Sequence, residues 1–88
     1  MKRIDPRIRT VVDGFGLTPR EAQLVELVAV GYSTEDIAEA LDISTATVRT
    51  HIRAIFSEVG VNSRSELVAR VLAKILRMVP PKKKASRR

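Results

Sequence analysis

The apolar positions of the chain recur at helical spacing. Two segments show this most clearly, with apolar side chains at Ala22, Leu24, Val25, Leu27, Val28 and Ala29 and again at Val48, Ile52, Ile55, Phe56 and Val59. Such spacing collects the apolar side chains on one face of an α-helix. No run of Val, Ile and Thr alternates cleanly with polar residues, as a half-buried strand would require. The pattern therefore predicts an all-α fold.

Residues that favour helix ends divide the chain into four core helices. A hydroxyl side chain, which commonly serves as an N-cap, stands before each of them at Thr18, Ser33, Ser44 and Ser63. Glu21 and Glu66 follow the first and last of these caps by three residues, which is the spacing of a capping box. Gly31 and Gly60 follow apolar stripes and favour the left-handed backbone that ends many helices. The last helix is predicted to run to about Met78.

Two further segments flank a predicted core domain of residues 17–79. Residues 1–16 are expected to form a loosely helical arm that packs on the core through Ile4, Ile8, Val11, Val12 and Phe15. Asp5-Pro6 and Gly14-Phe15-Gly16 are expected to limit its regularity. Residues 80–88 are predicted to be a disordered basic tail, because Pro80 and Pro81 stop the preceding helix and nothing after them can be buried. The tail would either add sequence-independent affinity for phosphates or only raise solubility.

The composition excludes most classes of enzyme and metalloprotein. Eighty-eight residues suffice for one domain. The chain has no cysteine and one histidine, His51, so disulfides, zinc sites and a Ser-His-Asp arrangement have little from which to form. The longest unbroken apolar run, Leu27 to Val30, is far too short for a membrane span, and no apolar segment follows Lys2 and Arg3 as in a secretory signal. We therefore expect a cytoplasmic, non-enzymatic module without cofactor, metal or membrane partner.

The charge of the chain is positive overall and unevenly distributed. The net charge is +6, of which residues 80–88 carry +5. Residues 20–42 carry −5, whereas residues 44–79 carry +4. A compact chain polarised in this way presents one face that attracts polyanions such as nucleic acid. The charge alone is equally consistent with a solvated surface that has an ordinary dipole.

Residues 34–56 have the pattern of a helix-turn-helix motif. A short helix carries the small residue Ala38 where two helices would cross, a tight turn follows at Asp42-Ile43, and a longer helix begins at Ser44. The outer face of this longer helix is formed by Thr45, Ala46, Thr47, Arg49, Thr50, Arg53 and Ser57. Its two arginines lie four residues apart and so point the same way, and no acid occurs in its first two turns.

This outer face suits the major groove of double-stranded DNA. Arginine presents a planar fork that fits guanine O6 and N7, and threonine methyl groups fit the methyl group of thymine. Short side chains at the start of the helix would let the backbone approach phosphates, with the first half of the helix in the groove. The same helix packing also occurs in proteins that bind no DNA, so the pattern alone leaves that alternative open.

The chain resembles the LuxR-type helix-turn-helix domain, the GerE-like output module also found at the C-terminus of NarL/FixJ response regulators. The resemblance covers residues 15–78, and its most specific segments are Leu17-Thr18-Pro19-Arg20-Glu21 and Thr47-Val48-Arg49-Thr50-His51. It implies a tetrahelical DNA-binding domain that activates or represses bacterial transcription, commonly as a dimer. It also implies base-reading roles for Arg49, Thr50 and Arg53 and places Ser44, Thr45 and Thr47 near phosphates. The chain departs from the family at Asp42, where glycine is frequent, and at Arg49, where lysine is frequent.

The last predicted helix carries a wide apolar stripe, formed by Leu67, Val68, Val71, Leu72, Ile75, Leu76 and Val79. The stripe is wider than one contact face needs in so small a domain. In the family this helix forms a two-fold interface, so the resemblance implies a homodimer through Val68, Leu72, Ile75 and Leu76. The alternative is that the N-terminal arm covers the excess face.

Together these features predict a bacterial transcription regulator that binds specific sequences of double-stranded DNA. The helix of about 44–60 would lie in the major groove, as part of a two-fold dimer, and RNA polymerase is a further candidate partner. One alternative is a promoter-binding domain like region four of a sigma factor. The other is a dimerising protein-interaction module that does not bind DNA.

Overall fold

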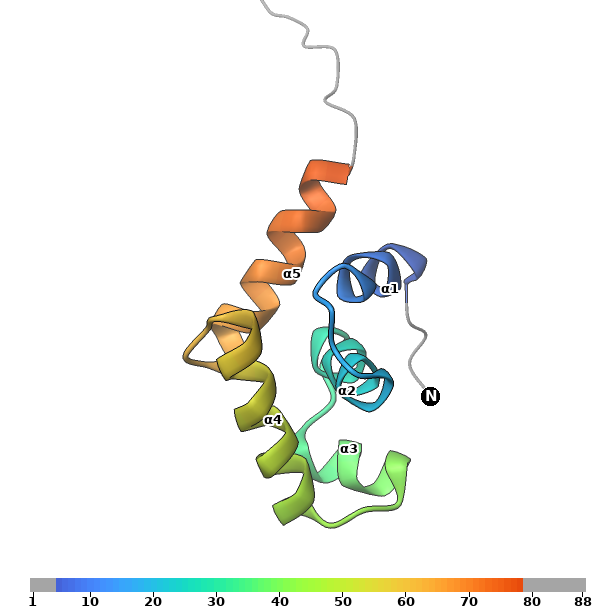
Figure 1. Cartoon of the computed structure of the whole chain (residues 1–88). Helices are drawn as coiled ribbons and strands as arrows, with labels where there is room; N and C mark the ends of the chain where they lie inside the picture. Colours follow the sequence, from blue (N-terminus) through green and yellow to red (C-terminus); the bar gives the residue numbers. More distant parts are fainter. Residues whose placement is uncertain (1–4, 79–88) are drawn as a thin grey trace, which may run out of the picture.

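The computed structural model describes residues 5–78, and every regular element among them is a helix. In chain order the helices are α1 (Pro6–Asp13), α2 (Pro19–Ala29), α3 (Thr34–Leu41), α4 (Thr45–Val59) and α5 (Arg64–Met78) (Figure 1). The predicted all-α fold is therefore confirmed for this part of the chain. Ile4, Val79 and the predicted tail of residues 80–88 lie outside the described residues.

The first two core helices begin with capping boxes, of which the sequence analysis predicts the one at Thr18. The Glu21 amide donates to Thr18 Oγ1 at 3.2 Å, and the Thr18 amide donates to Glu21 Oε1 at 3.1 Å. Ser33 and Asp36 make the same reciprocal exchange at the start of α3. Two backbone donors that would lack partners at each helix start are thereby satisfied.

Helix α5 begins with only half of the predicted capping box. The Glu66 amide donates to Ser63 Oγ at 3.1 Å, as expected. The Glu66 carboxylate, however, accepts from the amide of Asn62 at 2.8 Å rather than from that of Ser63. The Glu66 side chain thus satisfies the amide of Asn62, one residue before the N-cap. The Ser63 hydroxyl and the Glu66 carboxylate are therefore both hydrogen-bonded at the start of α5.

The N-terminal arm is more regular than the sequence analysis expects. Asp5 is the N-cap of α1, and its carboxylate accepts from the Arg7 amide at 2.8 Å. Pro6 occupies the first helical position, where its fixed φ favours a helix and its missing N–H costs nothing. The Asp5-Pro6 pair therefore starts a helix instead of limiting one, and α1 continues to Asp13.

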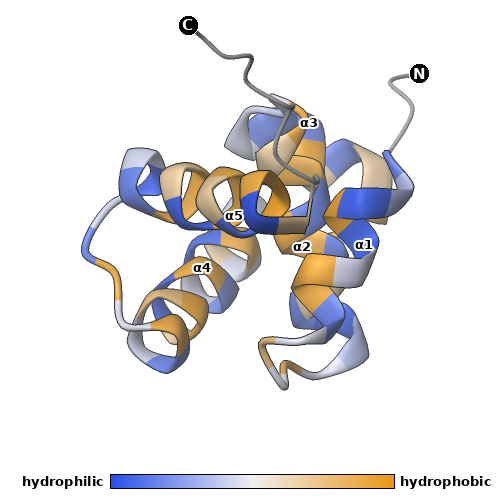
Figure 2. Ribbon diagram, turned by 90° about the horizontal axis from the view of Figure 1, so that it is seen from above, coloured by the Kyte–Doolittle hydropathy of each residue, from blue (hydrophilic) through white to orange (hydrophobic). Residues whose placement is uncertain are grey.

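The core is aliphatic and draws on all five helices. Its largest fully buried side chains are Leu24, Ile37, Ile55, Leu67, Val12, Val25 and Val48. Helix α2 lies at the centre, because it packs against each of the other four helices. Seen from above, α1, α2 and α5 lie beside one another (Figure 2).

The helices form two groups that share α2. Helix α3 packs mainly against α4 and more lightly against α2, whereas α5 packs against α1 and α2. Figure 1 shows α3 and the start of α4 at one end of the molecule and the last turns of α5 at the other. The α3–α4 unit (Thr34 to Val59) therefore projects from a body made of α1, α2 and α5. Among the described helices, none has the length and apolar character needed to cross a membrane.

Candidate nucleic-acid interface

A left-handed residue makes the turn between α3 and α4. Asp42 has φ 57° and ψ 49°, a conformation that an L-residue adopts at some cost and that aspartate tolerates better than most. The following amide, that of Ile43, donates back to the carbonyl of Ala38 at 3.0 Å. Asp42, which stands where glycine is frequent in the family that the chain resembles, thus adopts the left-handed backbone that glycine favours. The tight turn brings Ser44 directly to the start of α4.

Helix α4 separates a packing face from an exposed face. Val48 and Ile55 are 0% and 1% exposed, respectively, and pack in the core. The predicted DNA-contacting residues lie on the opposite side, where Ser44, Ala46, Thr47, Arg49, Thr50 and Arg53 are exposed and Thr45 is half-buried. From here on, the outer face of α4 means these seven residues, which include the N-cap Ser44 and leave out Ser57 of the face derived from periodicity. His51 is half-buried, beside the packing face.

Arg49 and Arg53 are the charged groups of this outer face. Neither makes an ion pair or a hydrogen bond with another described residue. The first turn of α4 contains no acid. Both guanidinium groups are therefore available to an anion or to the edge of a base.

The hydroxyls at the start of α4 bond to one another and to the backbone. Ser44 Oγ accepts from the Thr47 amide at 3.0 Å and donates to Thr47 Oγ1 at 2.9 Å. Thr50 Oγ1 donates to the carbonyl of Ala46 at 3.1 Å. The Thr47 hydroxyl proton is left without a partner among the described residues. It lies in the first turn, where the helix dipole is positive and favours a phosphate.

The sequence of most of this fold matches a known family. Residues 16–71 match the family described as "Bacterial regulatory proteins, luxR family". The chain belongs to the luxR family. The match confirms the resemblance that the sequence analysis states. Helix α1 lies before the matched residues.

Curated relatives of this luxR-family chain carry the name of a transcriptional regulator. They include "HTH-type transcriptional regulator MalT" of Yersinia pestis and of Klebsiella pneumoniae subsp. pneumoniae. The former is 38% identical over 63 residues, which is 72% of this chain and 7% of the relative. The same figures hold for the latter. The chain therefore spans only a small part of the length of these relatives. No solved structure matches the chain significantly.

In this luxR-family chain the apolar stripe of α5 is partly covered. Val71 is buried, Val68 and Ile75 are half-buried against the core, and α1 packs along one side of the helix. Leu72 and Leu76 remain 52% and 63% exposed, respectively. The arm thus covers part of the excess apolar face, and an apolar pair one turn apart stays open to solvent.

Two arginines of the positively charged segment 44–79 have partners within the protein. Arg64 and Arg70 are half-buried, and both donate hydrogen bonds to oxygen atoms of other elements, Arg64 to residues at least 30 positions away and Arg70 to Val59 at the end of α4. Sequence reasoning missed these contacts. The only local signal is that Arg64 occupies the first residue of a helix, where the dipole disfavours a cation.

Two carboxylates meet where α2 begins and α4 ends. Desolvation raises the pKa of the Glu58 carboxyl group. The charge of Glu21 and a hydrogen bond between the two side chains raise this pKa further. In the described part of the chain, no three His, Asp or Glu side chains gather in a way that could hold a metal ion.

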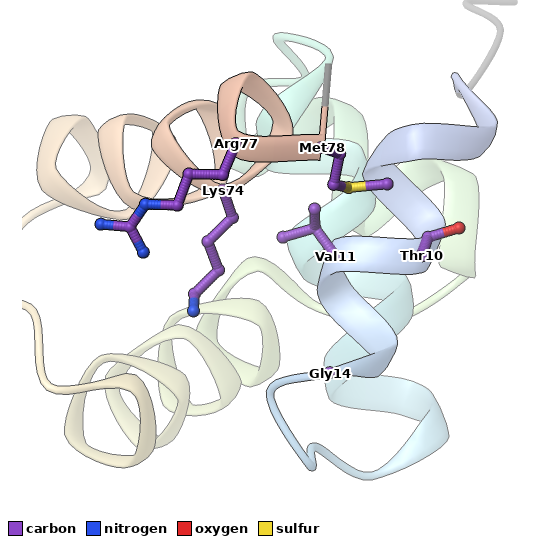
Figure 3. A pocket seen from close by; sticks show the side chains of 6 residues that line it. All are labelled: Thr10, Val11, Gly14, Lys74, Arg77 and Met78. Atoms are coloured by element: carbon purple, nitrogen blue, oxygen red, sulfur yellow. The ribbon is translucent and has the colours of Figure 1, made fainter. Parts of the chain in front are cut away.

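A pocket of about 300 Å³ lies between α1 and the end of α5. Its lining residues are Thr10, Val11, Gly14, Lys74, Arg77 and Met78 (Figure 3). In Figure 3 the Met78 side chain points towards α1, whereas the Arg77 side chain points away from it. The Lys74 ammonium lies 5.8 Å from the centre of the Phe15 ring, just beyond the end of α1. No residue of α4 lines the pocket, so it is separate from the outer face of α4.

Proposed function

We propose that the chain binds specific sequences of double-stranded DNA with α4 in the major groove and thereby regulates transcription. The observation that carries this proposal is the outer face of α4, with two arginines that have no partner among the described residues. The opposite face of the same helix is buried, so the arginines are held outward by the packing of the core. Membership of a family of bacterial regulatory proteins supports the proposal, as does the name of the MalT relatives.

The side chains divide by role along the helix. Arg49, Thr50 and Arg53 would contact base edges, since the major groove admits an α-helix and arginine binds guanine with two hydrogen bonds. Ser44, Thr45 and Thr47 surround the start of the helix and would contact phosphates, with Ala46 small enough to permit close approach. In this proposal residues 17–79 form the DNA-binding domain, residues 1–16 support it as an arm, and the protein acts in the cytoplasm.

A two-fold dimer extends this proposal to the DNA site. Leu72 and Leu76 are exposed one turn apart on α5, beside the half-buried Val68 and Ile75, and would form the contact. A two-fold pair would place two α4 helices about one DNA turn, roughly 34 Å, apart and would favour an inverted repeat. Contact with RNA polymerase would follow binding at a promoter.

The test begins with selection of duplexes from random DNA by the full chain, followed by affinity measurements at two salt concentrations. Arg49→Ala and Arg53→Ala should each cost roughly 1–3 kcal/mol of affinity for the selected site and relax its sequence preference. Arg77→Ala removes the same charge from an exposed position on α5 and serves as the control. Enrichment of no sequence, or unchanged affinity in both variants, would contradict the proposed role of α4. Failure to bind any DNA would favour a protein-interaction module.

A further inference from the structure

Two arginines of α5 hold the two ends of the α3–α4 unit. Arg64 Nη1 donates to the carbonyl of Tyr32 at 2.9 Å, and Arg64 Nη2 donates to Thr34 Oγ1 at 3.0 Å. Arg70 Nη1 donates to the carbonyl of Val59 at 3.3 Å. Thr34 is the first residue of α3 and Val59 is the last residue of α4. Both ends of the unit are thus bonded to the same helix.

These contacts join parts of the molecule that otherwise pack little on each other. The α3–α4 unit packs on the rest of the molecule chiefly through α2, whereas α5 packs on α1 and α2. A unit supported mainly along one helix can rotate about that helix if nothing else restrains it. Arg64 and Arg70 lie where they would oppose such a rotation, because they bond its two ends to a second helix.

The chemistry of arginine fits this restraint. The planar guanidinium directs several N–H groups in fixed directions, so Arg64 can bond a carbonyl and a hydroxyl at once. Hydrogen bonds from a charged donor are stronger than those between neutral groups. A lysine keeps the charge but offers a single flexible ammonium, which cannot reproduce the fixed pair of directions.

We propose that Arg64 and Arg70 are positioning residues that fix the direction of α4 relative to α5. Because α5 would carry the dimer contact and α4 would read the DNA, this direction sets the separation of the two reading helices. The two arginines thereby determine how strictly the protein measures the distance between half-sites. This inference rests on the proposed function.

The first experiment measures tolerance to spacing. The DNA is an inverted repeat selected by the full chain, with no, one or two base pairs inserted at its centre. We expect one inserted pair to weaken binding of the natural chain at least tenfold, but binding of Arg64→Lys or Arg70→Lys only two- to threefold. Affinity for a single half-site should stay within about twofold. Arg77→Lys, on the same helix and without a hydrogen bond to the α3–α4 unit, should behave as the natural chain.

Two results of this experiment would overturn the inference. One is that the single variants Arg64→Lys and Arg70→Lys are both folded and discriminate between the spacings as sharply as the natural chain does. The other is a salt dependence reduced by about one phosphate in Arg64→Gln or Arg70→Gln, which remove the charge that lysine keeps, because that would assign the arginine to the DNA itself. Thermal unfolding of each variant, followed by circular dichroism, shows whether it is folded at the temperature of the assay.

A second experiment needs no DNA and separates this inference from the proposed function. The chain has no cysteine, so Ala40→Cys on α3 and Ala73→Cys on α5, both at exposed positions, allow two spin labels to be attached specifically. The distribution of distances between the labels should broaden in Arg64→Lys and Arg70→Lys and stay unchanged in Arg77→Lys. Equal widths in all four proteins would refute the restraint, even if DNA binding is established. A broadened distribution without any DNA binding would retain the restraint and refute the proposed function.

Discussion

At the scale of single residues, Glu21 and Glu58 show how the ends of two helices affect each other. Glu21 is buried and forms the capping box of α2, so its position is fixed by the helix that it starts. Glu58, in the last turn of α4, lies next to it and has a raised pKa. Because the folded state binds this proton more tightly than the unfolded state does, the resulting stability is present below the ordinary pKa of glutamate. It is lost as the pH rises through the raised value.

Glu58→Gln should therefore raise the melting temperature at about pH 7, where the natural carboxylate repels Glu21. The difference from the natural chain should shrink towards about pH 4, because Glu58 then carries its proton. Glu39→Gln, at an exposed position on α3, is the control for loss of a negative charge. The net charge of the chain is +6, so loss of an acid by itself adds to the overall repulsion. Equal melting temperatures of Glu58→Gln and the natural chain at pH 7 would contradict this prediction.

At the scale of elements, α1 is an addition to the family domain that contributes to the core. It lies before the matched residues 16–71 but buries Val11 and Val12. Arg9 Nε lies 3.4 Å from Glu26 Oε2, and the Glu26 side chain is only 9% exposed. Helix α1 therefore supplies both apolar surface and the partner of a buried carboxylate on α2.

Val12→Ala should lower the free energy of unfolding by about 2 kcal/mol, because it leaves a cavity at a fully buried position. Thr10→Ala, at an exposed position on the same helix, should change it by less than about 1 kcal/mol. Denaturation in urea measures both values. A loss in Val12→Ala no larger than that in Thr10→Ala would show that α1 does not stabilise the domain.

The helices were predictable to the extent that their signals are local. The caps at Thr18 and Ser33 and the stripe of α4 depend on residues within four positions of one another, and the structure agrees with all three. Asp5-Pro6 was misjudged, because the same residue pair can interrupt a helix or begin one. Here Asp5 is the N-cap and Pro6 takes the first helical position, so the pair begins a helix.

At the scale of the whole molecule, α5 contributes both to the core and to an exposed apolar surface. Its Leu67 and Val71 are buried in the core, whereas its Leu72 and Leu76 are exposed. An exposed apolar pair beside a packed face is a candidate for contact with a second copy, since burial of apolar surface drives association.

The double variant Leu72→Glu with Leu76→Glu should sediment as a monomer and bind an inverted repeat no better than a single half-site. Its free energy of unfolding should change little, because both side chains are exposed in the single chain. Met78→Glu, which alters an exposed apolar side chain at the pocket beside α1, is the control. If the natural chain sediments as a monomer at high micromolar concentration, even with DNA, the prediction of a dimer is contradicted.

The sequence indicates the outer face of α4 but not the contacts that hold α4 in place. The face follows from helical periodicity once Val48 and Ile55 are assigned to the core. The contacts of Arg64 with Tyr32 and Thr34 join residues at least 30 positions apart. No local pattern specifies which carbonyl a side chain reaches across that separation, so these arginines were counted only as surface charge.

The left-handed backbone of Asp42 limits how this position can change. Glycine could replace it readily, and asparagine would keep a side chain that tolerates the same backbone hand. Valine or isoleucine would have to leave that conformation, and the turn would then open. The departure would shift the first residue of α4, so a substitution outside the proposed DNA interface would still redirect every side chain that we propose contacts DNA.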